Sequence, residues 1–150
     1  EDKKQLLEND LIRLCFAEDI AIRKFLFDEV KTEWLMTELS QKIYEKVYIH
    51  LHSANAPEAS LIMDELKNET YRNKLAELVF DLEKLTPTLK SAEDCVTRLE
   101  KNWINTHIQF LRDELKNAES SGKDPIPIMK QIEELQSRIN SISYQCSSDE

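Results

Sequence analysis

Glycine is almost missing from this sequence, with one residue in 150, and proline occurs only four times. Such scarcity argues against a turn-rich β architecture, which needs both residues at its turns. Apolar residues make up 41% of the chain and charged residues 33%, a balance that argues against disorder. We therefore expect an all-α protein, and 150 residues suffice for one domain with its own core.

Cysteines are also few, and basic residues are fewer than acidic ones. The three cysteines, Cys15, Cys95 and Cys146, are odd in number and far apart, so neither a disulfide framework nor a paired-cysteine metal site is indicated. Acidic residues outnumber basic ones by 29 to 20, a net charge of −9, whereas gripping phosphates requires clustered lysine and arginine. We expect reduced thiols and no direct binding of nucleic acid.

Long apolar runs are missing as well, so the sequence predicts no membrane span and no cleavable signal segment. The chain is expected to be soluble, intracellular and monomeric when alone. It starts at Glu1 rather than at methionine, which is typical of a piece excised from a larger protein. Catalytic chemistry could then belong to other parts of that protein.

No residue pattern typical of an active site is found. On a helix, His50 and His52 would point about 200° apart, so they suit no shared metal ion, and His107 is expected to pack as a polar-edged ring. The adjacent carboxylates at 113–114 and 133–134 diverge in the same way, whereas a catalytic pair converges in a dry cleft. We therefore expect no catalytic residue, no cofactor and no metal, and hence no enzyme activity in this fragment.

Helical periodicity runs through the first ninety residues. Asp19 suits the cap of one predicted helix, Pro57 suits the first turn of another, and the dipeptide at 86–87 ends the last. Each helix carries a single apolar stripe, so we expect residues 1–90 to form a compact bundle. The apolar spacing predicts its helices over residues 5–17, 19–30, 32–52, 57–68 and 69–85.

A much longer helix is predicted to follow. The letters SAED, starting at Ser91, match a capping signature, and neither glycine nor proline appears before Gly122, so one helix could run about thirty residues. The apolar stripe moves by roughly a quarter-turn along it, more than the ~20° per heptad that a straight helix produces. Its two halves are therefore expected to face different neighbours.

The only glycine and two of the four prolines lie together in NAESSGKDPIPIMKQIEEL, between two heptad patterns. Gly122 is expected to end one helix in the left-handed conformation and Asp124 to cap the next, with Pro125 and Pro127 in its first turn. When the apolar residues before Gly122 are paired in reverse order with those after Asp124, the two residue numbers of each pair sum to 246 or 247. A constant sum of this kind predicts an antiparallel helical hairpin. The seam residues are Ile104, Ile108, Leu111, Leu115, Ile128, Ile132, Leu135, Ile139 and Ile142.

Outside this seam the last helix is polar, so the region 91–143 is expected to project from the bundle into water or against a partner, with a flexible tail over 144–150. Apolar anchors that remain partly exposed would mark a protein interface. The alternative is that Trp103 packs at the junction with the bundle and Met129 packs beside the tip. The candidate partner-binding residues are Phe110, Glu114, Ile126, Met129, Gln131, Glu134 and Arg138.

This layout resembles the C-terminal domain of bacterial DNA primases of the DnaG type. The resemblance lies in a small helical bundle followed by LKNETYRNKLAELVFDL, the long helix AEDCVTRLEKNWINTHIQFLRDELKNA and a final helix ending near IEELQSRINSI. It implies a bacterial, cytoplasmic domain that does not itself synthesise RNA primers. In that family the bundle modulates the replicative DnaB-type helicase, and the hairpin docks on the helicase's N-terminal domains.

Two other identities remain open on the sequence. One is the N-terminal domain of a replicative helicase, itself a small helical bundle with a hairpin, although the final letters SYQCSSDE carry no pattern of a linker to an ATPase. The other is a generic helical scaffold or adaptor, because paired helical arms occur widely. In the primase reading, the zinc-binding and polymerase domains lie upstream, and nothing here matches them.

Overall fold

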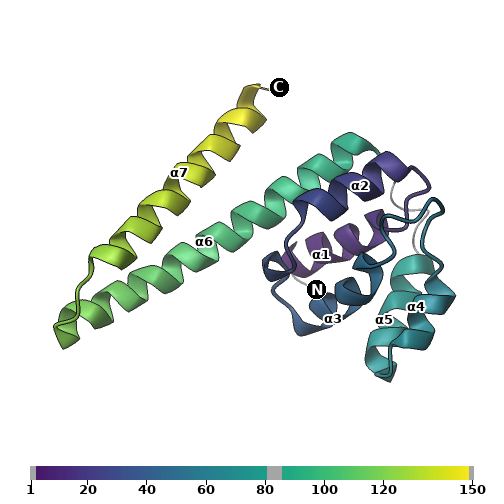
Figure 1. Ribbon diagram of the computed structural model, residues 1–150, viewed down its shortest axis with the longest axis horizontal. Helices are drawn as coiled ribbons and strands as arrows, with labels where there is room; N and C mark the ends of the chain where they lie inside the picture. Colours follow the sequence, from purple (N-terminus) through teal and green to yellow (C-terminus); the bar gives the residue numbers. More distant parts are fainter. Residues whose placement is uncertain (1–2, 81–85, 149–150) are drawn as a thin grey trace. The chain divides into compact units, whose positions relative to one another are not determined.

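The computed structural model describes residues 3–80 and 86–148, with side chains as far as residue 142. Its regular elements within these ranges are seven α-helices and one short 3₁₀-helix, without a strand, so the predicted all-α class is confirmed (Figure 1). Of the described helices, none combines the length and the apolar content that crossing a bilayer requires. Two compact units divide the chain, residues 1–99 and residues 100–150.

The first unit is a bundle in which α3 contacts η1, α1, α4 and α5. Its core takes one stripe from each helix, including the fully buried side chains of Leu11, Leu26, Tyr44 and Leu75. Burying these stripes against one another is the main force that stabilises the unit. Its elements are α1 (Lys3–Leu14), α2 (Ile20–Glu29), η1 (Thr32–Trp34), α3 (Glu38–Tyr48), α4 (Ala59–Glu65), α5 (Glu69–Phe80) and the beginning of α6 (Leu89–Ser121).

The prediction of one continuous helix over 32–52 is wrong. The chain forms η1, leaves helical geometry, and starts α3 only after Thr37, whose hydroxyl oxygen accepts a hydrogen bond from the Ser40 N–H at 3.3 Å. The buried Glu8 carboxylate of α1 accepts the Met36 and Thr37 N–H groups at 2.7 and 3.2 Å. Because a side chain from another helix satisfies these two donors, the break is stable although the apolar spacing continues through it.

Three predicted helix starts can be compared with the observed ones. Asp19 caps α2 as expected, since its carboxylate accepts the Ala21 N–H at 2.9 Å. Pro57 lies just before α4 rather than in its first turn. The predicted cap at Ser91 is also wrong: Thr88 and Ser91 exchange two hydrogen bonds of 2.9 Å between side-chain oxygens and backbone N–H groups, and α6 begins at residue 89. A reciprocal capping box of this kind satisfies two donors at once.

The second unit pairs the later part of α6 with α7 (Ile126–Ser148), which runs back along it in the opposite direction (Figure 1). Gly122, with φ 75°, ends α6, and the Lys123 N–H donates to the Ala118 carbonyl at 2.9 Å, the closing bond of a Schellman motif. The Asp124 carboxylate then accepts the Ile126 N–H at 3.0 Å. The predicted glycine stop and aspartate cap are thus confirmed.

Other details of the hairpin ends differ from expectation. Pro127 lies in the first turn of α7, while Pro125 precedes the helix and its carbonyl accepts the Met129 N–H at 3.0 Å. The helix continues to Ser148, beyond residue 144, where the tail was expected to begin. The end of the predicted helix over 69–85, from residue 81 onward, and the Cys146 side chain lie outside the described residues.

Candidate functional site

The hairpin is held by one apolar cluster along its seam. This cluster contains each of the nine seam residues that the heptad spacing predicted, together with Trp103. Ile104, Ile108, Leu111, Ile132 and Ile142 are at most 9% exposed, whereas the other members are partly buried. The side chains that hold the two helices together are therefore packed against each other. Any docking surface must come from residues outside the seam.

One ion pair between the helices does not fit the predicted register. The Arg138 guanidinium binds the Glu100 carboxylate through two nitrogens, at 2.8 and 3.2 Å. Sums of 246 or 247 would place Arg138 opposite residue 108 or 109, about 12 Å or more from Glu100 along the helix. Both side chains would also lean away from each other, since side chains tilt toward their own N-terminus.

At the level of Arg138, then, α7 lies closer to the N-terminal end of α6 than the pairing predicted. A seven-residue repeat can shift by one heptad and still bring apolar positions together. Spacing therefore identifies the seam residues without selecting their partners. The ion pair between Arg138 and Glu100 marks the register that the structure has at this level.

Three large apolar side chains are exposed among the hairpin residues whose side chains the structure describes. Phe110 on α6 is 54% exposed, and Ile126 and Met129 at the start of α7 are 54% and 45% exposed. Each was among the residues predicted to bind a partner. Exposed aromatic and methionine side chains are enriched in the cores of protein interfaces, so these three are the strongest candidates for anchors.

Phe110 is also the last of three aromatic rings that contact one another in sequence along α6. The Trp103 and His107 rings stack with centroids 4.8 Å apart and planes 9° apart, and His107 lies 6.0 Å from Phe110. The sequence indicated only that the three lie near one another. Their spacing of four and then three residues was the signal for a common helix face, and the stacking fixes the orientation of the rings.

The predicted polar contact residues have different surroundings. Glu114, Gln131 and Glu134 are exposed on the hairpin. Arg138 is also exposed, at 53% of its side chain, but the ion pair with Glu100 occupies its guanidinium. A structural role in holding the helices together is thus the first explanation for Arg138.

A small pocket lies beside the tip, with a volume of about 240 Å³. Glu114 and Ile128 line it, as do Ala118 and Lys123 next to the glycine stop. The pocket combines a carboxylate, an ammonium group and an apolar floor. Features of this kind suit a side chain of a protein partner better than a cofactor, which is usually more deeply enclosed.

The histidines have packing or pairing neighbours. His50 Nε2 lies 3.6 Å from a Glu65 carboxylate oxygen, and the His52 ring lies against Phe27 with centroids 3.8 Å apart. Across the part of the chain that the structure describes, no group of three or more histidine, cysteine, aspartate or glutamate residues is arranged to hold a metal ion.

Comparison of the chain with protein-family models, with curated proteins and with solved structures finds no match.

Proposed function

We propose that this chain is a non-catalytic protein-interaction domain that docks through its hairpin on the N-terminal domain of a DnaB-type replicative helicase. The observation that carries the proposal is the exposure of Phe110, Ile126 and Met129 on a hairpin whose seam is already filled by other residues. The identity of the partner comes from the resemblance to the C-terminal domain of DnaG-type primases.

The hairpin surface supports a protein partner rather than a nucleic acid. Acidic and basic side chains are mixed on it, as at Arg112, Asp113, Glu114 and Lys116, and such a surface offers no continuous positive track for a phosphate backbone. Mixed charges of this kind fix orientation and partner choice more than they supply affinity. Docking should therefore weaken only moderately with salt.

Recruitment is the proposed consequence of docking. In a larger protein with primer-synthesising parts, a bound hairpin would hold those parts next to freshly unwound template. Tethering raises their effective concentration there without any new contact to DNA. An acidic interaction domain is compatible with this role, because contacts to the template would belong to other parts.

The test is a calorimetric titration of the purified N-terminal domain of a DnaB-type helicase with the intact chain, a chain ending at Ala118, and the variant Phe110→Ala/Met129→Ala. Removing α7 should abolish binding. The double variant should weaken binding by about tenfold or more, as expected when two interface anchors are truncated.

The matched control is Ile49→Ala/Leu61→Ala, which truncates two side chains of the first unit that are 61% and 54% exposed. It should bind as tightly as the unchanged chain. Equal binding by the chain ending at Ala118 would rule out docking through the hairpin. Failure of the intact chain to bind would rule out the helicase and favour a scaffold with another partner.

A further inference from the structure

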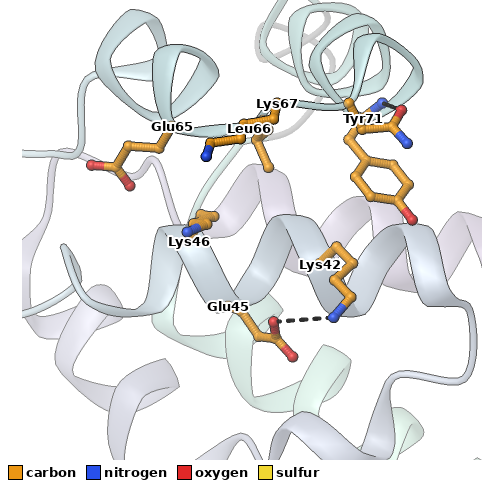
Figure 2. A pocket seen from close by; sticks show the side chains of 8 residues that line it. Lys42, Glu45, Lys46, Glu65, Leu66, Lys67 and Tyr71 are labelled. Atoms are coloured by element: carbon orange, nitrogen blue, oxygen red, sulfur yellow. Dashed lines mark hydrogen bonds and ion pairs between the residues drawn. The ribbon is translucent and has the colours of Figure 1, made fainter.

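The first unit contains a second candidate site, which the proposed docking does not use. A pocket of about 360 Å³ opens between α3 and the connection from α4 to α5 (Figure 2). Lys42 and Lys46 lie on α3 at its lower side in this view, and Leu66, Lys67 and Tyr71 lie above it. Three lysines thus line a single hollow in a chain whose net charge is −9.

Two carboxylates also line the pocket, and each has a nearby partner, which for Glu45 is the pocket residue Lys42. Glu45 lies 3.9 Å from the Lys42 ammonium group, and Glu65 lies 3.6 Å from His50 Nε2. Figure 2 shows Glu65 turned away from the pocket. For Lys46 and Lys67, no ion pair is found with any described residue. The ammonium groups of Lys46 and Lys67 are therefore available to an anion in the pocket.

The upper wall of the pocket is well fixed. Leu66 is 4% exposed, and its carbonyl accepts a hydrogen bond from Arg72 Nη1 at 3.0 Å. The Asn68 side chain caps α5 by accepting the Thr70 and Tyr71 N–H groups at 2.8 and 3.3 Å. Because the cap occupies these donors, negative charge in the pocket would be met by the lysines and not by the start of the helix.

We propose that this pocket binds a small phosphorylated molecule, with its phosphate between Lys46 and Lys67 and its apolar or aromatic part against Leu66 and Tyr71. Lysine binds phosphate as a point charge with three donors. Lys46 lies on α3 and Lys67 on the connection from α4 to α5, so the two ammonium groups can approach one anion from the two sides of the pocket. The Tyr71 ring supplies a flat surface on which a base or another planar group can stack.

The size of the pocket favours a small molecule over a macromolecule. A volume of about 360 Å³ lies at the lower end of the range of small-molecule sites, roughly 300–1,000 Å³. It is large enough for a sugar phosphate or a nucleoside monophosphate. A polynucleotide would need positive charge beyond the pocket, whereas the flanking Glu45 and Glu65 are acidic.

The experiment is a nuclear magnetic resonance titration of the whole ¹⁵N-labelled chain at constant ionic strength with inorganic phosphate, adenosine monophosphate, adenosine and a glutamate-rich peptide. We expect saturable shifts at residues 42, 46 and 66–71 with the monophosphate, weaker ones with phosphate, and none with adenosine. The variant Lys46→Gln/Lys67→Gln should bind adenosine monophosphate about tenfold more weakly, because it lacks the charge-assisted contacts.

The matched control is Lys4→Gln/Lys24→Gln, which removes the same charge from exposed positions of the first unit that do not line the pocket. It should leave the affinity unchanged. The proposal is overturned if the two double variants weaken binding equally, if the shifts never saturate, or if the peptide binds more tightly than the monophosphate. Since both variants alter exposed side chains, their thermal unfolding should match that of the unchanged chain.

Discussion

Burial decides the chemistry of the thiol groups of Cys15 and Cys95. Both are buried in the first unit, and Cys95 Sγ lies 3.7 Å from the Leu7 carbonyl. Removal from water raises the pKa of the Cys15 thiol, and the nearby Cys95 adds to this effect. For Cys95, burial and then the Asp10 carboxylate raise the pKa to about 12. A nucleophilic cysteine needs the opposite shift, so both thiols act here as small apolar side chains.

This environment predicts that the free energy of unfolding falls in alkaline solution. Unfolding returns the Cys95 pKa to about 9, from about 12 in the folded chain. Below pH 9 both states hold the proton, and the full stability is present. Between pH 9 and 12 the unfolded state binds fewer protons, so stability falls by at most ~1.4 kcal/mol per pH unit for this one group.

Urea unfolding of the chain and of Cys95→Ala at pH 8 and pH 10 measures the effect. Cys95→Ala will be less stable at both pH values because it leaves a cavity. From pH 8 to pH 10, however, its free energy of unfolding should fall by less than that of the unchanged chain. Tyr44, whose pKa burial also raises, contributes in the same direction in both proteins and therefore cancels in the comparison. An equal loss in the two proteins would contradict the prediction.

At the scale of elements, the helix ends show which local signals are sufficient. Asp19, Gly122 and Asp124 act where the sequence placed them, since each provides its own hydrogen bond or backbone conformation within a few residues. The break before α3 could not be seen in this way. It depends on Glu8, a residue of another helix.

The turn of the hairpin gives a prediction at this scale. A Cβ atom added at Gly122 would meet no atom within 4 Å, so Gly122→Ala creates no clash. Its left-handed backbone, with φ +75°, is nevertheless unfavourable for a residue with a Cβ atom by about 1–2 kcal/mol. The hairpin should lose about that much stability.

Hydrogen exchange of α7 amides measures this loss directly. Gly122→Asn is the matched control, because asparagine tolerates the left-handed region better than alanine. It should lose less protection than Gly122→Ala. Equal protection in Gly122→Ala and the unchanged chain would mean that the turn adopts a different conformation.

At the scale of the whole molecule, two compact units share one continuous helix. Residues 1–99 and 100–150 form the units, and α6 contributes to both. The sequence predicted the division at residue 90, just before a helix expected from Ser91, whereas α6 begins at residue 89. Buried residues near the start of α6, such as Ala92, Cys95 and Leu99, explain why the first unit includes its opening turns.

Separate cores predict separate responses to substitution. Ile108 is 6% exposed within the seam, so Ile108→Ala should destabilise the hairpin by about 2–4 kcal/mol. Amide protection should fall along residues 104–142 and stay unchanged in α1 and α3. Phe110→Ala, two positions away but at a residue 54% exposed, should leave protection in both units unchanged. Loss of protection in α1 and α3 with Ile108→Ala would show that the two cores unfold together.

The amino-acid sequence by itself determined the helical class, the seam residues and the glycine stop. These follow from periodicity and from local backbone preferences, which act over a few residues. Only the tertiary structure decided the break before α3, the partner of Arg138 and the pocket that brings Lys46 and Lys67 together. Each of these depends on atoms of separate helices meeting in space, and neither a repeat nor a propensity specifies which atoms meet.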